Sequence, residues 1–301
     1  MNSDCLQNGL TPDERQRFLD DGYLVVPNAL DRSTLDRLIC AVDRVDARER
    51  TPSHACDRLL SFANILPEDE AFLGLIDCPQ VFPKVWGILG WNIYVYHTHL
   101  DVTPPVETPP AKPVAWHQDS MRVNEELELH PRPRLSLKIG YYLTDVKEPN
   151  WGNTLLVPKS HLRDELDCPN DGVANPRGAI PLQVAAGSAL ILDRRLWHSR
   201  STNYGPQTRK VLWYGYAYRW LRTKDEMTVQ HLWDHVDPIR RQLLGYFANA
   251  NSAYDPVESD VPLREWLHEH FPNDARWSPH HSSEQARPTL HGIRGKNSGR
   301  R

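Results

Sequence analysis

Two histidines and one aspartate have the residue types and spacing of a metal site. His117 and Asp119 stand two residues apart in the segment Trp116-His-Gln-Asp119, and His198 lies far downstream. Residues two apart in a β-strand point to the same side, so His117 and Asp119 can face one cavity. With a histidine from a distant strand they form a facial set on Fe(II), which leaves three adjacent positions for a bidentate co-substrate and dioxygen.

A His-x-Asp pair alone is weak evidence, because the chain holds a second one in His99-Leu-Asp101. The surroundings of His198 strengthen the hypothesis. An apolar strand precedes His198, a turn over residues 203–206 follows it, and Arg209 opens the next predicted strand 11 residues later. If these two strands form a hairpin, Arg209 lies opposite His198. Its guanidinium can then grip a carboxylate whose other end chelates the metal.

These motifs resemble those of the phytanoyl-CoA dioxygenase family of iron(II)- and 2-oxoglutarate-dependent oxygenases, which includes ectoine hydroxylase and natural-product hydroxylases. The likeness runs from about Phe18 to Trp220, and it includes Asn153–His161, which is similar to the family's "NG…PGSH" stretch. It implies a jelly-roll core, iron(II), 2-oxoglutarate as co-substrate, and O₂ as the oxidant. The resemblance assigns the iron to three ligands, which are His117, Asp119 and His198.

Two positions depart from the family's pattern. Lys159 stands where a glycine usually precedes the Ser-His pair, and Arg200 stands where many members carry a serine that contacts the 2-oxoglutarate carboxylate. Ser201 or Thr202 can substitute for that serine. Arg200 is also the alternative to Arg209 for gripping the far carboxylate, because it stands closer to the distal histidine in the sequence.

The strand predicted over residues 92–100 adds further candidates. Alternation puts two sets of side chains on opposite faces of this segment, with His97, His99 and Asp101 on one and Tyr96, Thr98 and Leu100 on the other. Ectoine hydroxylase resembles this strand, with polar, inward-facing residues at the positions of His97 and Asp101. The resemblance makes His97 a candidate for binding 2-oxoglutarate and Asp101 a candidate pocket residue.

Two later strands supply the remaining pocket candidates. In the strand predicted over residues 135–143, Ser136 and Lys138 face away from the apolar side chains. A lysine between apolar neighbours costs free energy unless it is paired with an acid. Lys138 therefore either meets an anionic group of substrate or co-substrate, or is a solvent-facing residue of the sheet. Trp213 shares its side of the strand with Arg209 and is a further pocket candidate, although tryptophan in a strand more often packs in a core.

The elements that must position these residues follow from hydrophobic period and turn chemistry. Thr11-Pro-Asp-Glu14 begins a helix that ends at Asp21-Gly22. Further helices are predicted from about residue 31 to 48 and over 80–89, and residues 51–70 are predicted to be irregular. Strands are predicted over residues 23–26, 92–100, 135–143, 154–157, 179–184, 188–193 and 209–219.

A helical preface before an all-β core indicates a mainly β protein with helical decoration, built on a double-stranded β-helix, or jelly roll, with N-terminal and C-terminal helices. We interpret residues 1–275 as a single oxygenase domain with its core at about 91–220. Residues 222–272 are predicted to be helical, and 276–301, rich in Ser, Arg and Gly, to be a flexible tail.

Composition narrows the class of protein. The 301 residues are 25% charged and carry a formal charge of −4, which is ordinary for a soluble protein. The chain has no basic stripe for nucleic acid and no apolar run of about 20 residues for a membrane span. The N-terminus lacks a secretory signal, and five scattered cysteines are typical of reduced thiols, so we expect a cytoplasmic protein.

The expected function is an iron(II)- and 2-oxoglutarate-dependent dioxygenase that hydroxylates a C–H bond of a small metabolite or natural product. Nothing in the chain resembles a cradle for the phosphates of coenzyme A. One alternative is the same iron chemistry with desaturation, cyclisation or epimerisation as its outcome. Another is a jelly-roll binding or sensing protein without turnover, which the complete ligand set and Arg209 argue against.

Overall fold

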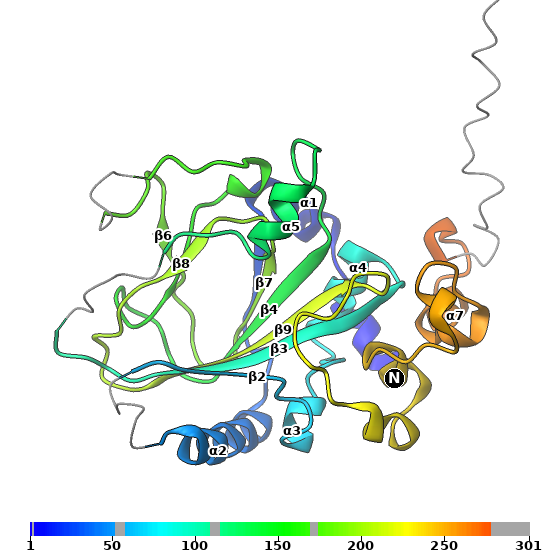
Figure 1. Ribbon diagram of the computed structural model, residues 1–301, viewed down its shortest axis with the longest axis horizontal. Coiled ribbons are helices and arrows are strands. Elements are labelled where there is room, and N and C mark those ends of the chain that lie inside the picture. Colours follow the sequence, from blue (N-terminus) through cyan, green and yellow to red (C-terminus); the bar gives the residue numbers. More distant parts are fainter. Residues whose placement is uncertain (2, 52–57, 109–114, 169–173, 278–301) are drawn as a thin grey trace, which may run out of the picture.

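Two antiparallel β-sheets form the centre of the computed structural model, which describes residue 1 and residues 3–51, 58–108, 115–168 and 174–277 (Figure 1). Six strands in the order β1-β7-β4-β9-β3-β2 make the larger sheet, and three in the order β6-β5-β8 make the smaller. The strands are β1 Tyr23–Val26, β2 Leu60–Ala63, β3 Ile93–Thr103, β4 Ser136–Tyr142, β5 Thr154–Leu156, β6 Ile180–Pro181, β7 Ala189–Asp193, β8 His198–Arg200 and β9 Arg209–Tyr218.

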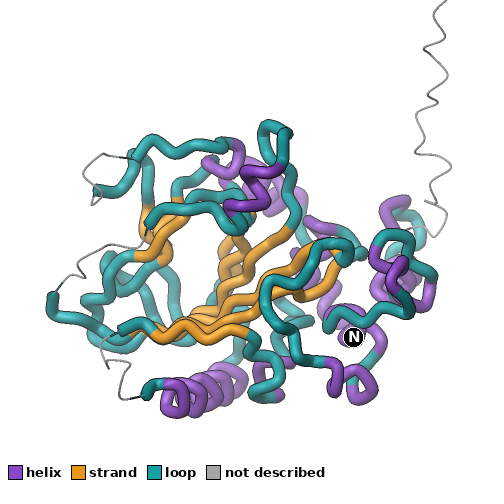
Figure 2. Tube along the Cα trace, viewed as in Figure 1, coloured by secondary structure: helices purple, strands orange, loops and turns teal. Residues whose placement is uncertain are grey.

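Helices precede and follow the sheets, as the sequence predicts (Figure 2). The α-helices are α1 Pro12–Asp21, α2 Arg32–Glu49, α3 Glu70–Leu73, α4 Phe82–Leu89, α5 Met121–Glu126, α6 Pro238–Leu243 and α7 Pro262–His270. The 3₁₀ helices are η1 Ser3–Asn8, η2 Ser160–Leu162, η3 Gln230–His235, η4 Ala250–Ala253, η5 Glu258–Asp260 and η6 Ala275–Trp277.

The predicted capping box of α1 is present. The Thr11 hydroxyl accepts the backbone N–H of Glu14 at 3.2 Å, and the Glu14 carboxylate accepts the N–H of Thr11 at 3.0 Å. Gly22 ends the helix with a φ of 83°, a left-handed conformation that glycine adopts without strain. The chain then enters β1, which pairs with β7 at the edge of the larger sheet.

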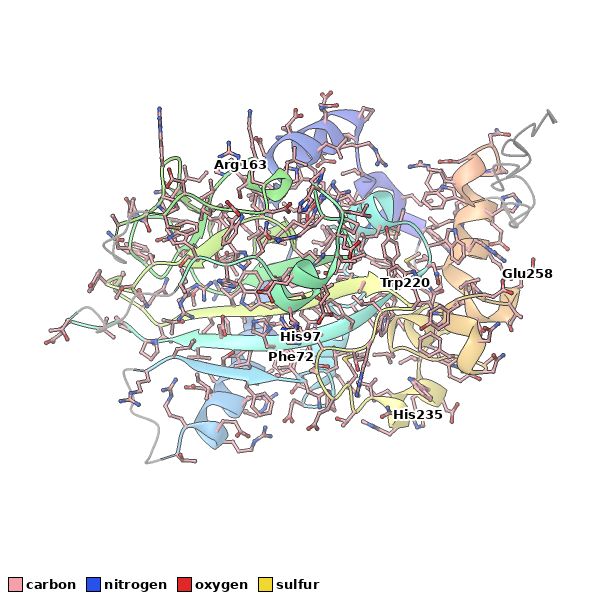
Figure 3. The ribbon with its side chains drawn as sticks, turned by 45° about the horizontal axis from the view of Figure 1, so that its top comes forward. Phe72, His97, Arg163, Trp220, His235 and Glu258 are labelled. Carbon is pink, nitrogen blue, oxygen red and sulfur yellow. The ribbon has the colours of Figure 1, made fainter. Side chains whose placement is uncertain are left out.

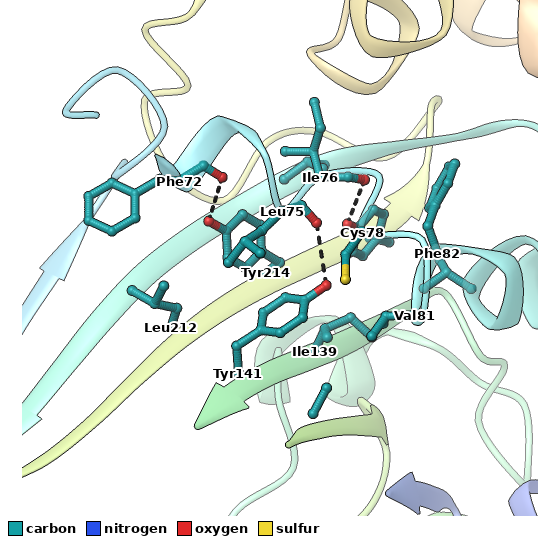
Figure 4. Packing of buried hydrophobic residues seen from close by; sticks show 14 of the residues in the cluster. Phe72, Leu75, Ile76, Cys78, Val81, Phe82, Ile139, Tyr141, Leu212 and Tyr214 are labelled. Atoms are coloured by element: carbon teal, nitrogen blue, oxygen red, sulfur yellow. Dashed lines mark hydrogen bonds between the residues drawn. The ribbon is translucent and has the colours of Figure 1, made fainter. Parts of the chain in front are cut away.

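The larger sheet packs against apolar residues on both faces. Its outer face packs on α2, α3 and α4, and tyrosine hydroxyls tie it to the chain around α3 (Figure 4). Tyr214 donates to the carbonyl of Phe72 at 2.7 Å, and Tyr141 donates to that of Leu75 at 3.3 Å. Its inner face shares a smaller core with the three-stranded sheet, made of Tyr142, Val146, Leu156, Leu182, Val184, Leu190, Leu192, Leu196, Val211 and Trp213.

Three predictions about the elements were wrong. Residues 51–70 are not irregular throughout, because β2 pairs with the end of β3, although residues 52–57 lie outside the described part of the chain. The strand predicted over 179–184 shortens to β6, where Pro181 has no N–H to donate. The strands around His198 and Arg209 do not form a hairpin, because β8 pairs with β5 while β9 pairs with β3 and β4.

The C-terminal part is only partly helical. Between residues 222 and 272 the short helices η3, α6, η4, η5 and α7 alternate with loops. Trp277 in η6 is buried, and the rest of the predicted tail, residues 278–301, lies outside the described residues. Within the described chain, no helix has the length and apolar character needed to span a membrane.

Candidate active site

The two predicted histidine ligands are joined through their backbones. His117 donates its N–H to the carbonyl of His198, and His198 donates its own to that of His117, both at 3.0 Å. The two rings lie 4.3 Å apart between centroids. The Asp119 carboxylate is 3.9 Å from Nε2 of His198, and one ligand atom from each of the three residues lies within 4.8 Å of the others. The structure therefore brings together His117, Asp119 and His198, although about 80 positions separate the first two from the third in the sequence.

The protonation of the two rings fits a metal ion. Nδ1 of His117 lies 3.0 Å from the carbonyl of Ala115, and Nδ1 of His198 lies 2.9 Å from that of Leu196. A carbonyl only accepts, so Nδ1 carries the proton and Nε2 keeps its lone pair for a metal. The Nε2 of His198 is buried without a hydrogen-bond partner. Burial also lowers the pKa of His198 to about 3, so the ring is neutral at physiological pH.

Residues that are not ligands hold the ligand-bearing loops, and the sequence pattern does not single them out. Gln118 points away from the cavity and donates to the carbonyls of Arg195, at 2.5 Å, and Arg163, at 3.0 Å. The fully buried Asp193 pairs with Arg195 at 2.7 Å and with Arg134 at 2.6 Å. These contacts fix the segment that leads into His198, so the metal geometry is set before any ion binds.

Lys138 lies beside the carboxylate ligand. Its ammonium is 3.3 Å from Oδ1 of Asp119 and 4.8 Å from the centre of the Trp213 ring. Burial alone raises the pKa of Asp119, but the charges of Lys138, the histidines and Lys224 outweigh it, so the net shift is downward. The side chain of Lys138 is 16% exposed, and it therefore does not face solvent. It meets an anion, the metal ligand itself.

Arg209 reaches the cavity from the larger sheet. It pairs with Thr103 on β3, and its Nη2 lies 3.5 Å from the hydroxyl of Thr154 on β5 of the facing sheet. Thr154 is two residues from Leu156, the partner of His198, so Arg209 and the ligand share one cavity. The side chain is 1% exposed, and neither Nε nor Nη1 has a hydrogen-bond partner in the described structure. A buried cation with free donors fits a carboxylate ligand.

Arg200, the competing candidate, already has an acidic partner. It lies 3.9 Å from Asp101, whose carboxylate also accepts the indole N–H of Trp213 at 3.2 Å. Burial, followed by the charge of Arg209, lowers the pKa of Arg200 to about 10, although Asp101 opposes the shift. Asp101 therefore contacts both Arg200 and Trp213, and the charge of Arg209 also acts on its carboxylate. The structure thus brings the predicted pocket residues Asp101 and Trp213 close to Arg209.

Of the two residues named as substitutes for the family serine, Ser201 has a side-chain partner in the structure. The Ser201 hydroxyl donates to the side-chain oxygen of Asn153 at 3.5 Å, and its N–H donates to the Asn153 backbone. The carbonyl of Thr202 accepts the N–H of Gly152 at 3.2 Å. The structure thus ties this stretch to the turn before β5 and gives Ser201 a partner other than Arg209.

His97 lies near the middle of β3, whereas Arg209 pairs with the last residue of that strand. It stands six residues before Thr103, the partner of Arg209, which is about 20 Å along a strand. Its Nε2 lies 2.9 Å from Nδ1 of His99, and its Nδ1 lies 3.3 Å from the carboxylate of Asp225. The structure therefore does not bring His97 to Arg209, and it places the side chain between His99 and Asp225 instead.

His99 and Tyr96 belong to the cavity although neither was a predicted site residue. His99 stacks on Trp213 with ring centroids 6.1 Å apart, and burial lowers its pKa to about 3. Tyr96 was predicted to face away, but a β-bulge between residues 95 and 97 breaks the alternation. Its hydroxyl lies 3.2 Å from that of Ser136, a predicted pocket residue. Gly215 permits this position, because a Cβ there would lie 2.6 Å from the Tyr96 ring.

Comparison with curated proteins gives relatives over most of the chain. An uncharacterized protein of Mycobacterium tuberculosis is 27% identical over 270 residues, which cover 84% of this chain and 95% of that protein. Ectoine dioxygenase of Bordetella parapertussis is 25% identical over 236 residues, covering 67% of this chain and 73% of the enzyme.

Solved structures share the fold at low identity. HygX from Streptomyces hygroscopicus, with nickel and 2-oxoglutarate bound, has a TM-score of 0.56 at 16% identity over 71% of this chain and 89% of its own. The α-ketoglutarate-dependent carbocyclase SnoK has a TM-score of 0.56 at 19% identity, covering 76% of this chain and 92% of its own. The epimerase SnoN has a TM-score of 0.52 at 20% identity, covering 67% of this chain and 80% of its own. The jelly-roll prediction is thereby confirmed.

The family model for phytanoyl-CoA dioxygenase matches residues 18–211, which include Arg209 and the three residues that could hold a metal ion. This range holds both central sheets except for residues 212–218 of β9. The chain therefore belongs to the phytanoyl-CoA dioxygenase family and is a dioxygenase that uses iron(II), 2-oxoglutarate and O₂.

Proposed function

We propose that the enzyme hydroxylates an unactivated C–H bond of a small metabolite or natural product. The overall reaction converts 2-oxoglutarate, O₂ and the substrate into succinate, CO₂ and the hydroxylated product. His117, Asp119 and His198 would hold the iron, and Arg209 would pair with the carboxylate of 2-oxoglutarate that does not chelate it. Bound iron(II) supplies the redox chemistry that couples the oxidation of the two organic molecules.

One observation supports this proposal above the others. A buried arginine with unpartnered nitrogens and a buried histidine with an unpartnered Nε2 occupy the same cavity, Arg209 from the larger sheet and His198 from the smaller. Each needs a ligand of a different kind, a carboxylate for the first and a metal for the second. A dicarboxylate that chelates the metal at one end satisfies both at once.

The protein groups determine what can enter the site. We propose that Tyr96 with Ser136, and His97 with Asp225, orient the substrate, because these two polar pairs lie on the strands that carry Lys138 and His99 or directly beside them. Lys138 holds the Asp119 carboxylate and keeps it aligned with the ligand histidines. The apolar inner core below excludes water from the reacting end, which strengthens each charge interaction there.

Production of succinate from 2-oxoglutarate tests the proposal. The purified protein with Fe(II) should convert ¹⁴C-labelled 2-oxoglutarate to CO₂ and succinate slowly without substrate, and His198→Ala should not. A wild-type protein that binds 2-oxoglutarate but never forms succinate would instead be the non-catalytic binding or sensing protein.

The outcome on the substrate has a second candidate. Similarity of fold to a carbocyclase and an epimerase makes ring closure or inversion an alternative end to the same oxidation. Mass spectrometry of the product separates the outcomes, because hydroxylation adds 16 Da, cyclisation or desaturation removes 2 Da, and epimerisation leaves the mass unchanged.

A further inference from the structure

A second cavity lies beyond the end of β9, outside the part of the chain that matches the family. Its volume is about 550 Å³, within the range of pockets that hold small organic ligands. It is formed mainly by residues 219–233 and 244–253, whereas the family match ends at residue 211. Figure 3 labels Trp220 at this place, beside the C-terminal helices. The aromatic residues in its wall are Tyr94, Trp220, Trp233 and Phe247.

A buried arginine, Arg219, contributes a positive charge to this cavity. Arg219 is 2% exposed, donates from Nη2 to the carbonyl of Tyr246 at 3.0 Å, and lies 4.6 Å from the Phe247 ring centre. Its Nε and Nη1 have no hydrogen-bond partner within the described residues. Burial lowers the pKa of Arg219 to about 10, while Asp260 opposes that shift through space. Asp260 accepts the N–H of Ala248 and is not hydrogen-bonded to Arg219.

Two exposed charges also line the cavity, Arg222 and Glu226. They have opposite signs, so the lining as a whole keeps the positive charge of Arg219. A guanidinium with two unpartnered nitrogens among aromatic faces has the chemistry to bind an organic anion with a flat ring body. The guanidinium supplies the counter-charge, and the rings supply the apolar surface.

The cavity shares a wall with the metal site. In the segment 221–227, Leu221 and Met227 line the second cavity, while Asp225 reaches His97 and accepts the N–H of Thr98. Arg219 directly follows β9, four residues beyond Gly215, the partner of Lys138. Four residues of extended chain span about 13 Å. A molecule that reaches both sites must therefore be elongated by about that distance.

We propose that this cavity binds the remote, non-reacting end of the substrate, an organic anion attached to a flat ring, and that Arg219 selects it. The part concerning the substrate rests on the proposed function, whereas the binding of such an anion does not. The position beyond the family match explains how this chain would choose a substrate of its own while it keeps the shared iron and 2-oxoglutarate residues.

The fluorescent probe 8-anilinonaphthalene-1-sulfonate, a ring system with one anionic group, tests the site in the full-length protein. Wild type should bind one equivalent, with emission sensitised by excitation of tryptophan because Trp220 and Trp233 line the cavity. Arg219→Gln should weaken binding at least tenfold. The control Arg163→Gln removes the same charge from an exposed position elsewhere and should change it less than twofold.

A second variant keeps Arg219 and fills the space. Ala253→Trp adds an indole at the partly exposed rim, and it should also weaken binding at least tenfold. His198→Ala should bind the probe as wild type does, because the metal site is a separate cavity. Equal binding by wild type and both cavity variants, or competitive displacement of the probe by 2-oxoglutarate, would overturn the proposal. Succinate formation by wild type, measured in parallel, tests the proposed function separately.

Discussion

Replacing Arg209 by alanine removes the only charge that we assign to the far carboxylate of 2-oxoglutarate. The side chain is 1% exposed, and its guanidinium lies between the Thr154 hydroxyl and the Tyr142 ring. Water therefore cannot replace it without a rearrangement. Truncating one partner of a buried charge pair costs about 2–5 kcal/mol, which corresponds to a loss of affinity of about 30-fold to several thousand-fold.

Anaerobic titration of 2-oxoglutarate into the Fe(II) protein measures this loss through the metal-to-ligand charge-transfer band. Arg209→Ala should need a far higher concentration of 2-oxoglutarate and keep nearly the same affinity for iron, since Arg209 is not a ligand. Arg209→Lys should recover only part of the loss, because an ammonium lacks the planar fork of the guanidinium.

Arg200→Ala is the matched control for this experiment, because Arg200 is a second buried arginine of the same cavity, paired with Asp101. It should weaken 2-oxoglutarate binding much less than Arg209→Ala does. If Arg209→Ala bound as tightly as wild type and Arg200→Ala did not, the role would pass to Arg200, and the argument from unpartnered nitrogens would be refuted.

Three further predictions concern the metal and its neighbours. His198→Ala should lose iron binding and succinate formation together, measured by metal analysis and turnover; near wild-type turnover would remove it from the ligand set. Lys138→Met should destabilise the metal-free protein, so that iron raises its unfolding temperature more than that of wild type or of the exposed control Lys147→Met; an equal gain would mean that Lys138 does not stabilise Asp119. Burial lowers the pKa of His99 to about 3, so between pH about 6.5 and about 3 the unfolded state binds one more proton than the folded state. The free energy of unfolding should therefore decrease by about 1.4 kcal/mol for each unit by which the pH is lowered in this range. Urea unfolding of His99→Gln should show a shallower pH dependence, and an unchanged slope would contradict a neutral buried ring.

Local rules were enough to predict the parts of the site that lie on one segment. The alternation of a strand aims His117 and Asp119 together, and the structure shows Gln118 turned away and hydrogen-bonded to neighbouring loops. The capping box at Thr11 is equally local. Each of these features is decided by residues within four positions, where the backbone geometry allows few alternatives.

The errors arose where distant contacts decide the structure. A turn between His198 and Arg209 is typical of a hairpin, yet β8 and β9 belong to different sheets, because their partners come from β5, β3 and β4. The bulge that turns Tyr96 inward depends on space above Gly215, more than 100 residues away. The hydrophobic pattern of a segment does not show which sheet the strand joins, nor where a bulge will interrupt it, so neither feature could be predicted from the sequence.

The backbone bridge between His117 and His198 has a consequence for the folding of the metal-free protein. It joins His117, which lies in no regular strand, to the first residue of β8 through two hydrogen bonds at 3.0 Å. A metal ion held by both side chains would reinforce the same junction, so the amides of His117 and His198 should exchange with deuterium more slowly once iron is bound. Bound iron would then stabilise the junction between His117 and His198, and loss of the iron would let this junction open before any strand of the larger sheet does.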